Sequence, residues 1–173
     1  MKKLVITIIS FLVLSSPLFS QEIEYRSQGY KGSVTYTNKI LMWNGIDTSH
    51  GYMFNENHYL GAGFGFYLVP QRVSMPIILH FYLDYHAYWF QRKSTPVAGI
   101  KLGYARSVHP KEANPNVSAL EIEPNIGWSW AIKSGQGLTL SLGAKIMTAP
   151  IRITENSSLP VSVLPNLGFA FEF

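Results

Sequence analysis

The last ten residues of the chain, LPNLGFAFEF (residues 164–173), decide the fold. Side chains of a strand alternate between its two faces, so this segment has one apolar face and one small or polar face. The apolar face holds Leu167, Phe169, Phe171 and Phe173. The other face holds Asn166, Gly168, Ala170 and Glu172. An aromatic face that continues to the last residue favours a strand against lipid, with the final strand of a soluble sandwich as the alternative.

This segment resembles the closing strand of Gram-negative outer-membrane β-barrels, which ends in Phe and carries alternate aromatic residues. The resemblance implies that Phe169, Phe171 and Phe173 form the signal that the barrel-assembly machinery reads. It also implies that this machinery is a partner of the chain.

The same alternation recurs upstream and predicts seven further strands. They run from Tyr30 to Ile40, Asp47 to Phe54, His58 to Val69, Met75 to Phe90, Val97 to Arg106, Leu120 to Trp130 and Leu138 to Met147. Long loops near residues 70, 110 and 155 alternate with short turns near residues 56, 92 and 135. Residues 43–45 (WNG) are interpreted as a further tight loop, and residues 149–160 as the last loop. The predicted fold is all-β, an eight-stranded antiparallel up-and-down barrel.

Barrel size decides which face of these strands is inside. One face carries Leu, Ile and aromatic residues on nearly every strand, whereas the other carries Gly, Ser, Thr and charges of both signs. Eight strands enclose only enough space for side chains, so the small and charged face fits inside and the bulky apolar face fits against lipid. The prediction is a transmembrane β-barrel with a polar lumen. Inward Gly61, Gly63 and Gly65 are expected to make room for large side chains from across the barrel.

The first 20 residues have the pattern of a secretory signal peptide. Lys2 and Lys3 precede an apolar run of about 11 residues, which is shorter than the roughly 20 that a spanning helix needs. Ser20 supplies a small residue at the cleavage point. We therefore expect residues 1–20 to be cleaved, residues 21–29 to form a short periplasmic leader and residues 30–173 to form the barrel.

Composition excludes several functions. Without Lys2 and Lys3 the 14 basic side chains become 12, against 10 acidic ones, and a near-neutral chain argues against nucleic acid as a partner. The sequence contains no Cys, which excludes disulfides and thiolate metal sites. His80 and His86 lie about 20 Å apart along one strand at ~3.3 Å per residue, too far to share an ion. No metal and no cofactor is expected.

Four short motifs follow one another in the predicted barrel: TSHGYMFN (48–55), LGAGFGFY (60–67), a strand that begins near Pro76, and KLGY (101–104). In this order they resemble the small outer-membrane β-barrel proteins common in Bacteroidetes. The resemblance covers about residues 30–173. It implies an outer-membrane location, contact with membrane lipid and lipopolysaccharide, a monomeric state, and a structural or interaction role at the cell envelope.

Inward charges are predicted to meet inside the barrel. If neighbouring strands pair about the predicted turns, Lys101 lies opposite Glu123 on one side and opposite Asp84 or His86 on the other. Lys145 then also lies opposite Glu123. The predicted lumen charge cluster consists of Lys101, Lys145, Asp84, Glu121 and Glu123. Because charges removed from bulk water must be paired, we interpret the cluster as a structural filling, with a narrow pore as the alternative.

Catalysis is the other alternative, because lipid A palmitoyltransferases and lipid A deacylases use eight-stranded outer-membrane barrels. The deacylase pattern has a His, a Ser two residues later and an acid nearby. Here Ser49 precedes His50, and the remaining candidates lack a Ser at that offset: His80, His86 and His109. No Ser-His-Asp set can be placed in the loops. The chain is therefore predicted not to be an enzyme, with a lipid A-modifying activity as the alternative.

Overall fold

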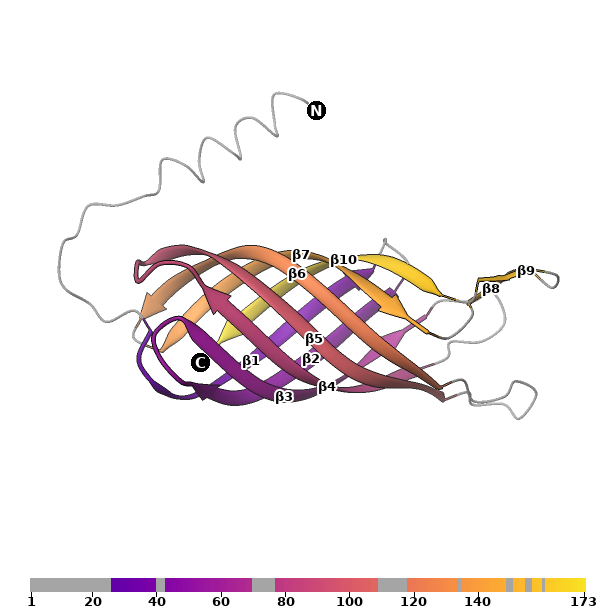
Figure 1. The fold of residues 1–173 in the computed structure, drawn as a ribbon, viewed down its shortest axis with the longest axis horizontal. Helices are drawn as coiled ribbons and strands as arrows, with labels where there is room; N and C mark the ends of the chain where they lie inside the picture. The colour runs from indigo at the N-terminus through magenta and orange to yellow at the C-terminus, as the bar shows by residue number, and fades with distance from the viewer. Residues whose placement is uncertain are drawn as a thin grey trace, which may run out of the picture.

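The computed structural model describes residues 26–39, 43–69, 77–108, 118–133, 135–148, 151–154, 157–159 and 161–173. Eight of its strands form a closed barrel in which all neighbours are antiparallel (Figure 1). The barrel strands are β1 (Gly29–Lys39), β2 (Trp43–Met53), β3 (His58–Leu68), β4 (Ile77–Tyr88), β5 (Ser94–Val108), β6 (Ser118–Lys133), β7 (Gln136–Met147) and β10 (Ser162–Glu172). The predicted eight-stranded up-and-down fold is confirmed. Within the described residues, no helix is long and apolar enough to cross a membrane.

The two ends of the barrel differ. At the turn end, short connections join β2 to β3, β4 to β5 and β6 to β7, and the carboxyl-terminal residue lies at the same end (Figure 1). There Phe173 and Gly32 exchange two backbone hydrogen bonds, of 2.7 and 2.9 Å, which close the barrel between β1 and β10. The connections from β3 to β4 and from β5 to β6 lie at the opposite end, the loop end. The predicted signal peptide and the predicted loop at residues 109–116 lie outside the described residues.

The predicted tight loop at residues 43–45 is wrong, because these residues begin β2. Trp43, Asn44 and Gly45 continue the ladder with β1, opposite Lys39, Asn38 and Thr37 respectively. Asn44 is an ordinary turn residue, but here its side-chain oxygen accepts hydrogen bonds from the Asn38 amide and the Tyr36 hydroxyl, each at 2.7 Å. Side-chain pairing across the ladder thus outweighs the local turn preference.

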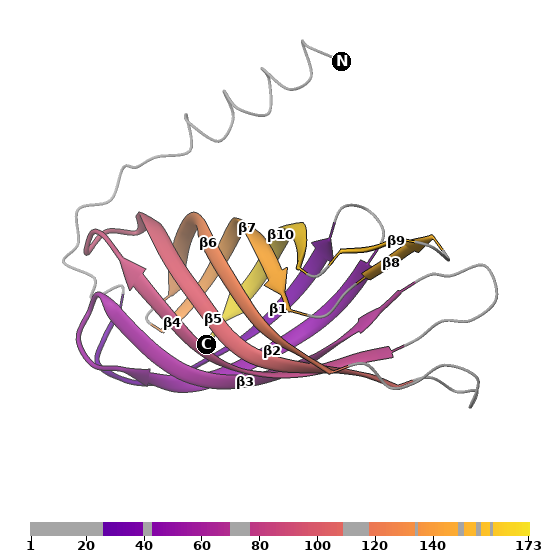
Figure 2. The same cartoon turned by 45° about the vertical axis from the view of Figure 1, so that its right-hand side comes forward.

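The segment predicted as the last loop contains a small second sheet. β8 (Ile151–Thr154) and β9 (Ser157–Leu159) pair as an antiparallel hairpin, which projects beyond the loop end of the barrel (Figure 2). Ile151, Ile153 and Thr154 are β-branched, which favours an extended backbone.

Burial confirms the assignment of the two faces. Outward apolar side chains are exposed on every barrel strand, with Phe81 at 64% and Ile126 at 68%. Inward polar side chains are buried or half-buried, with His80 and Lys145 at 1%. The interior of this barrel is therefore its polar core, and its apolar surface faces outward.

Gly63 and Gly65 of β3 make room for side chains of the neighbouring strand β4. Gly61 makes room for Tyr59 of its own strand, so none of the three serves a side chain from across the barrel. Gly63 pairs with Tyr82 of β4, and Gly65 pairs with His80. A Cβ atom built on Gly63 would lie 2.4 Å from the Tyr82 ring, and one on Gly65 would lie 2.6 Å from His80 Nε2. The Tyr82 and His80 rings of β4 thus lie over the backbone of β3, because the glycine paired with each ring has no side chain.

Candidate functional site: an ion-pair network inside the barrel

Two apolar clusters bound the interior. The turn-end cluster consists of Met53, Tyr59, Tyr88 and Val97. The loop-end cluster consists of Tyr67, Val69, Ile78, Ala105, Ala119 and Met147, with Trp43 and Leu164 packed against it. Both form where the strands enter their connections. The loop-end cluster screens the middle of the barrel from water at that end.

The lumen network lies between these clusters and consists of Lys39, Asp47, His80, Lys101, Glu121, Glu123 and Lys145. All seven side chains are buried. Glu123 is its centre: its carboxylate accepts from Lys39 Nζ at 2.9 Å and from Asn166 Nδ2 at 2.7 Å. Lys145 Nζ lies 3.6 Å from the same carboxylate and 2.6 Å from that of Glu121. Strands from opposite walls of the barrel are therefore joined through their charges.

Asp47 is the second centre of the network. Lys101 Nζ donates to its carboxylate at 3.2 Å, and the Tyr67 hydroxyl donates to it at 3.3 Å. His80 connects Asp47 to Glu121, because its Nε2 lies 2.9 Å from Asp47 Oδ1 and its Nδ1 lies 2.8 Å from Glu121 Oε1. Glu121 in turn shares Lys145 with Glu123. Each carboxylate in this low-dielectric space thus has a charged or hydrogen-bonding partner, as burial requires.

The structure places all five residues of the predicted charge cluster inside the barrel. Lys101, Lys145, Glu121 and Glu123 belong to the lumen network, and Asp84 is also buried. The strand register sets Lys101 opposite both Asp84 and Glu123. The ion pairs follow a different pattern.

The predicted position of Lys101, opposite Asp84 and Glu123, is confirmed, but neither residue forms its ion pair. Its ion pair is with Asp47 of β2, because the long lysine side chain reaches past β4 and β3. Asp84 faces His86 of its own strand at 3.1 Å. The predicted approach of Lys145 to Glu123 is present, at 3.6 Å, although its shorter contact is with Glu121.

Three network residues were missed: Lys39, Asp47 and His80. Lys39 and Asp47 alternate in step with the small and polar residues of their strands, so period-two alternation was the signal that could have placed them inside the barrel. Their partners could not be found from neighbouring strands, because Lys39 of β1 reaches Glu123 of β6 across the lumen. His80 was considered as a metal ligand and as a catalytic base, not as a bridge between two carboxylates. Among the described residues, no group of three His, Cys, Asp or Glu side chains could hold a metal ion.

A second ion pair lies nearer the turn end. Lys31 Nζ is 2.7 Å from Glu172, whose carboxylate also accepts hydrogen bonds from the hydroxyls of Tyr88 and Thr139. Arg26, in the predicted leader, is buried over the Tyr88 ring at 4.7 Å and donates to the Arg92 carbonyl at 3.0 Å. The chain that precedes β1 is thereby anchored across the turn end.

Ser49 and His50 lie on opposite faces of β2. The Ser49 hydroxyl is buried and hydrogen-bonded to the Tyr59 hydroxyl at 2.8 Å. His50 points outward, between Tyr30 and Thr48, with its ring 6.2 Å from that of Phe173. The two side chains therefore cannot act together as nucleophile and base.

Gly65→Ala is expected to weaken the network directly. The added Cβ would lie 2.3 Å from Asp47 Oδ1 and 2.6 Å from His80 Nε2, so it would push His80 away from Asp47. We expect the free energy of unfolding to fall by about 1–3 kcal/mol, as for other overpacked interiors. Urea unfolding of the refolded protein in lipid measures this change. Ala62→Ser, on the outer face of the same strand, is the control, and an equal loss in both variants would contradict the prediction.

No family model and no curated protein matches this chain. Among solved structures, the N-terminal β-barrel domain of Pseudomonas aeruginosa OprF superposes with a TM-score of 0.58 at 12% identity, covering 86% of this chain and 98% of that one. Neisserial surface protein A superposes with a TM-score of 0.59 at 12% identity, covering 83% of this chain and 92% of that one. The outer membrane enzyme PagL is more distant, with a TM-score of 0.44, and carries no argument about activity. This chain shares its fold with small outer-membrane β-barrels.

Proposed function

We propose that this chain is a small integral outer-membrane β-barrel protein with a side-chain-filled polar lumen, and that its role at the cell envelope is structural or in interaction with other envelope components. One observation carries the proposal: the lumen network is fully paired and lies between two apolar clusters. An ion crossing this interior would have to break several buried ion pairs and pass the apolar loop-end cluster, and both steps are costly.

The outer surface supports a membrane location. Large apolar side chains are exposed on every strand of the barrel, an arrangement that is unfavourable in water and favourable in lipid. Exposed aromatic side chains gather near the turn end, where they suit a membrane interface: Trp89, Phe90, Trp128, Phe171 and Phe173. With the turn end in the periplasm, the loop end and the β8–β9 hairpin would meet lipopolysaccharide and the cell exterior.

The route to this location is part of the proposal. Cleavage after Ser20 would release the chain into the periplasm, and the barrel-assembly machinery would read Phe169, Phe171 and Phe173. All three side chains are exposed on the outer face of β10. A monomer satisfies the whole ladder, because β1 and β10 pair within one chain.

The purified protein is expected to give no stable conductance in planar lipid bilayers, because its buried charges are paired and an apolar cluster fills its loop end. The measurement requires folded protein, which a heat-dependent shift in gel mobility establishes for each preparation. The control is Glu123→Ala combined with Lys39→Ala and Lys145→Ala, which removes the centre of the network. Reproducible single-channel steps from the unmodified folded protein would contradict the proposal and favour a narrow pore.

A further inference from the structure

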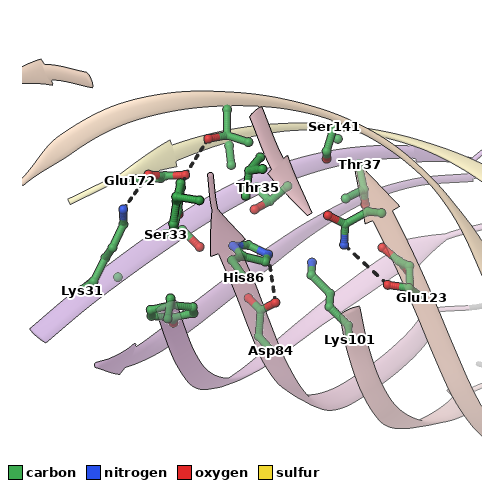
Figure 3. Close-up of a pocket in the computed structure, with 18 of the residues that line it drawn as sticks. Lys31, Ser33, Thr35, Thr37, Asp84, His86, Lys101, Glu123, Ser141 and Glu172 are labelled. Atoms are coloured by element: carbon green, nitrogen blue, oxygen red, sulfur yellow. Dashed lines mark hydrogen bonds and ion pairs between the residues drawn. The ribbon is translucent and has the colours of Figure 1, made fainter. Parts of the chain in front are cut away.

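The interior is not uniformly filled. A cavity of about 30 Å³ lies between two different walls (Figure 3). One wall consists of β1, β7 and β10, whose side chains between Lys31 and Glu172 at one end and Asn166 at the other are short and include the hydroxyls of Ser33, Thr35, Thr37 and Ser141. The other wall carries Asp84, His86, Lys101 and Glu123 from β4, β5 and β6. The cavity exists because the first wall has no long inward side chain at these positions.

The cavity lies on the turn-end side of the lumen network. Inward side chains along it are only half-buried: Lys31, Ser33, Thr35, His86, Asn125 and Ser141. Inward side chains towards the loop end are fully buried: Tyr67, His80, Glu121, Lys145 and Met147. Among the polar inward side chains of the described strands, half burial is thus confined to those along the cavity, whereas the half-buried Trp43 and Leu164 at the loop end are apolar.

Asp84 Oδ1 at the cavity is ion-paired with His86, but two other buried polar atoms there have neither a hydrogen-bond partner nor an ion-pair partner. They are Thr37 Oγ1, in a side chain that is 1% exposed, and Asn166 Oδ1, in a side chain that is 6% exposed. The Asn166 amide nitrogen donates to Glu123 at 2.7 Å, which fixes the orientation of the amide. Both residues line the cavity. Buried polar atoms are nearly always satisfied, if not by protein then by ordered water.

The charged side chains of the cavity already have partners. Lys31 pairs with Glu172, Asp84 with His86, and Lys101 with Asp47. Glu123 pairs with Lys39. An ion entering the cavity would therefore find no free counter-charge. A neutral molecule that both donates and accepts hydrogen bonds would fit the hydroxyl wall.

We infer that the lumen contains a hydrated vestibule, entered from the turn end and ending at Thr37 and Asn166, that binds water. A water molecule can donate to Asn166 Oδ1 and either donate to or accept from the Thr37 hydroxyl. At ~10–15 Å³ for each water, the cavity holds about two of them. The barrel is then a cup that is open towards one side of the membrane. This inference concerns half of the lumen and does not depend on whether the protein conducts.

Single cysteines test the vestibule cleanly, because the sequence contains none. Ser33→Cys, Thr35→Cys and Ser141→Cys place a thiol in the vestibule, whereas Ala105→Cys and Ala119→Cys place one in the loop-end cluster. Each refolded variant is treated with methyl methanethiosulfonate, a small neutral thiol reagent, and intact mass gives the rate. Heat-dependent gel mobility confirms folding. We expect the vestibule thiols to react at least about tenfold faster, because the others react only after local opening.

A pair of matched substitutions tests the route. Ala170→Leu fills the vestibule, and it should slow the reaction of Thr35→Cys. Ala62→Leu makes the same change on the outer face and should leave that rate unchanged. Vestibule thiols that react as slowly as Ala105→Cys, or a rate that Ala170→Leu does not alter, would overturn the inference. Fast reaction at Ala105→Cys would overturn it too, by showing a passage open from both ends, whereas conductance alone decides the proposed function.

Discussion

Lys145→Met is expected to lower the free energy of unfolding by about 3–5 kcal/mol, the usual cost of leaving a buried charge without its partner. The Lys145 side chain is 1% exposed, and its ammonium group lies 2.6 Å from Glu121 and 3.6 Å from Glu123. Met fills a similar volume, so the loss reports charge rather than packing. Urea unfolding in lipid vesicles, followed by Trp fluorescence, measures the change.

Two controls separate a buried pair from a general loss of lysine. Lys93→Met removes an exposed lysine from the turn between β4 and β5 and should change stability by at most about 0.5 kcal/mol. Adding Glu121→Gln to Lys145→Met should restore part of the loss, because the amide needs no counter-charge. Equal unfolding midpoints for Lys145→Met and Lys93→Met would show that the Lys145 charge is not paired inside the barrel.

Phe173→Asp is expected to affect assembly in cells far more than stability in vitro. The Phe173 ring is 38% exposed and contacts Phe171 and His50, so its loss should cost the refolded barrel about 1–2 kcal/mol. The backbone hydrogen bonds between Phe173 and Gly32 remain available. If the closing segment is the assembly signal, the variant will be nearly absent from the outer membrane, although it refolds in detergent.

Phe66→Asp is the matched control, because Phe66 is an outward phenylalanine of β3 that is equally exposed, at 38%, but lies near the loop end of the barrel. It should reduce outer-membrane levels much less than Phe173→Asp does. Phe173→Tyr should be tolerated, since the position suits an interfacial aromatic side chain. Quantitative immunoblots of membrane fractions compare the three variants. Normal levels of Phe173→Asp would show that the last residue has no special role in assembly.

The fold could be predicted because alternation with period two defines two faces for each strand. Only the question of which face is inside then remains, and the small size of the barrel answers it. The same rule placed Lys101, Lys145 and Glu123 inside. The predicted tight loop at residues 43–45 was wrong because the turn preferences of Asn and Gly are outweighed when a neighbouring strand forms hydrogen bonds with them. The residues around 43–45 in the sequence do not reveal which hydrogen bonds a neighbouring strand will form with them.

The ion pairs could be predicted only in part, because strand register describes neighbours and the lumen joins strands that are not neighbours. Lys101 passes its register partner Asp84 and reaches Asp47, while Lys39 crosses from β1 to β6. Such contacts depend on the curvature of the closed barrel and on the lengths of side chains. The alternation of residues along the sequence shows neither the curvature of the barrel nor how far a side chain reaches across it.

The position of Glu123 has a consequence for folding. Its partners come from β1, β7 and β10, and Lys39 and Asn166 are 84 and 43 residues away in the sequence. Lys39 and Asn166 themselves face each other across the seam between the first and last strands. A sheet whose seam is still open would leave these groups without partners, so closure and pairing should occur together. The chain should therefore unfold in a single cooperative step, with no stable half-closed barrel.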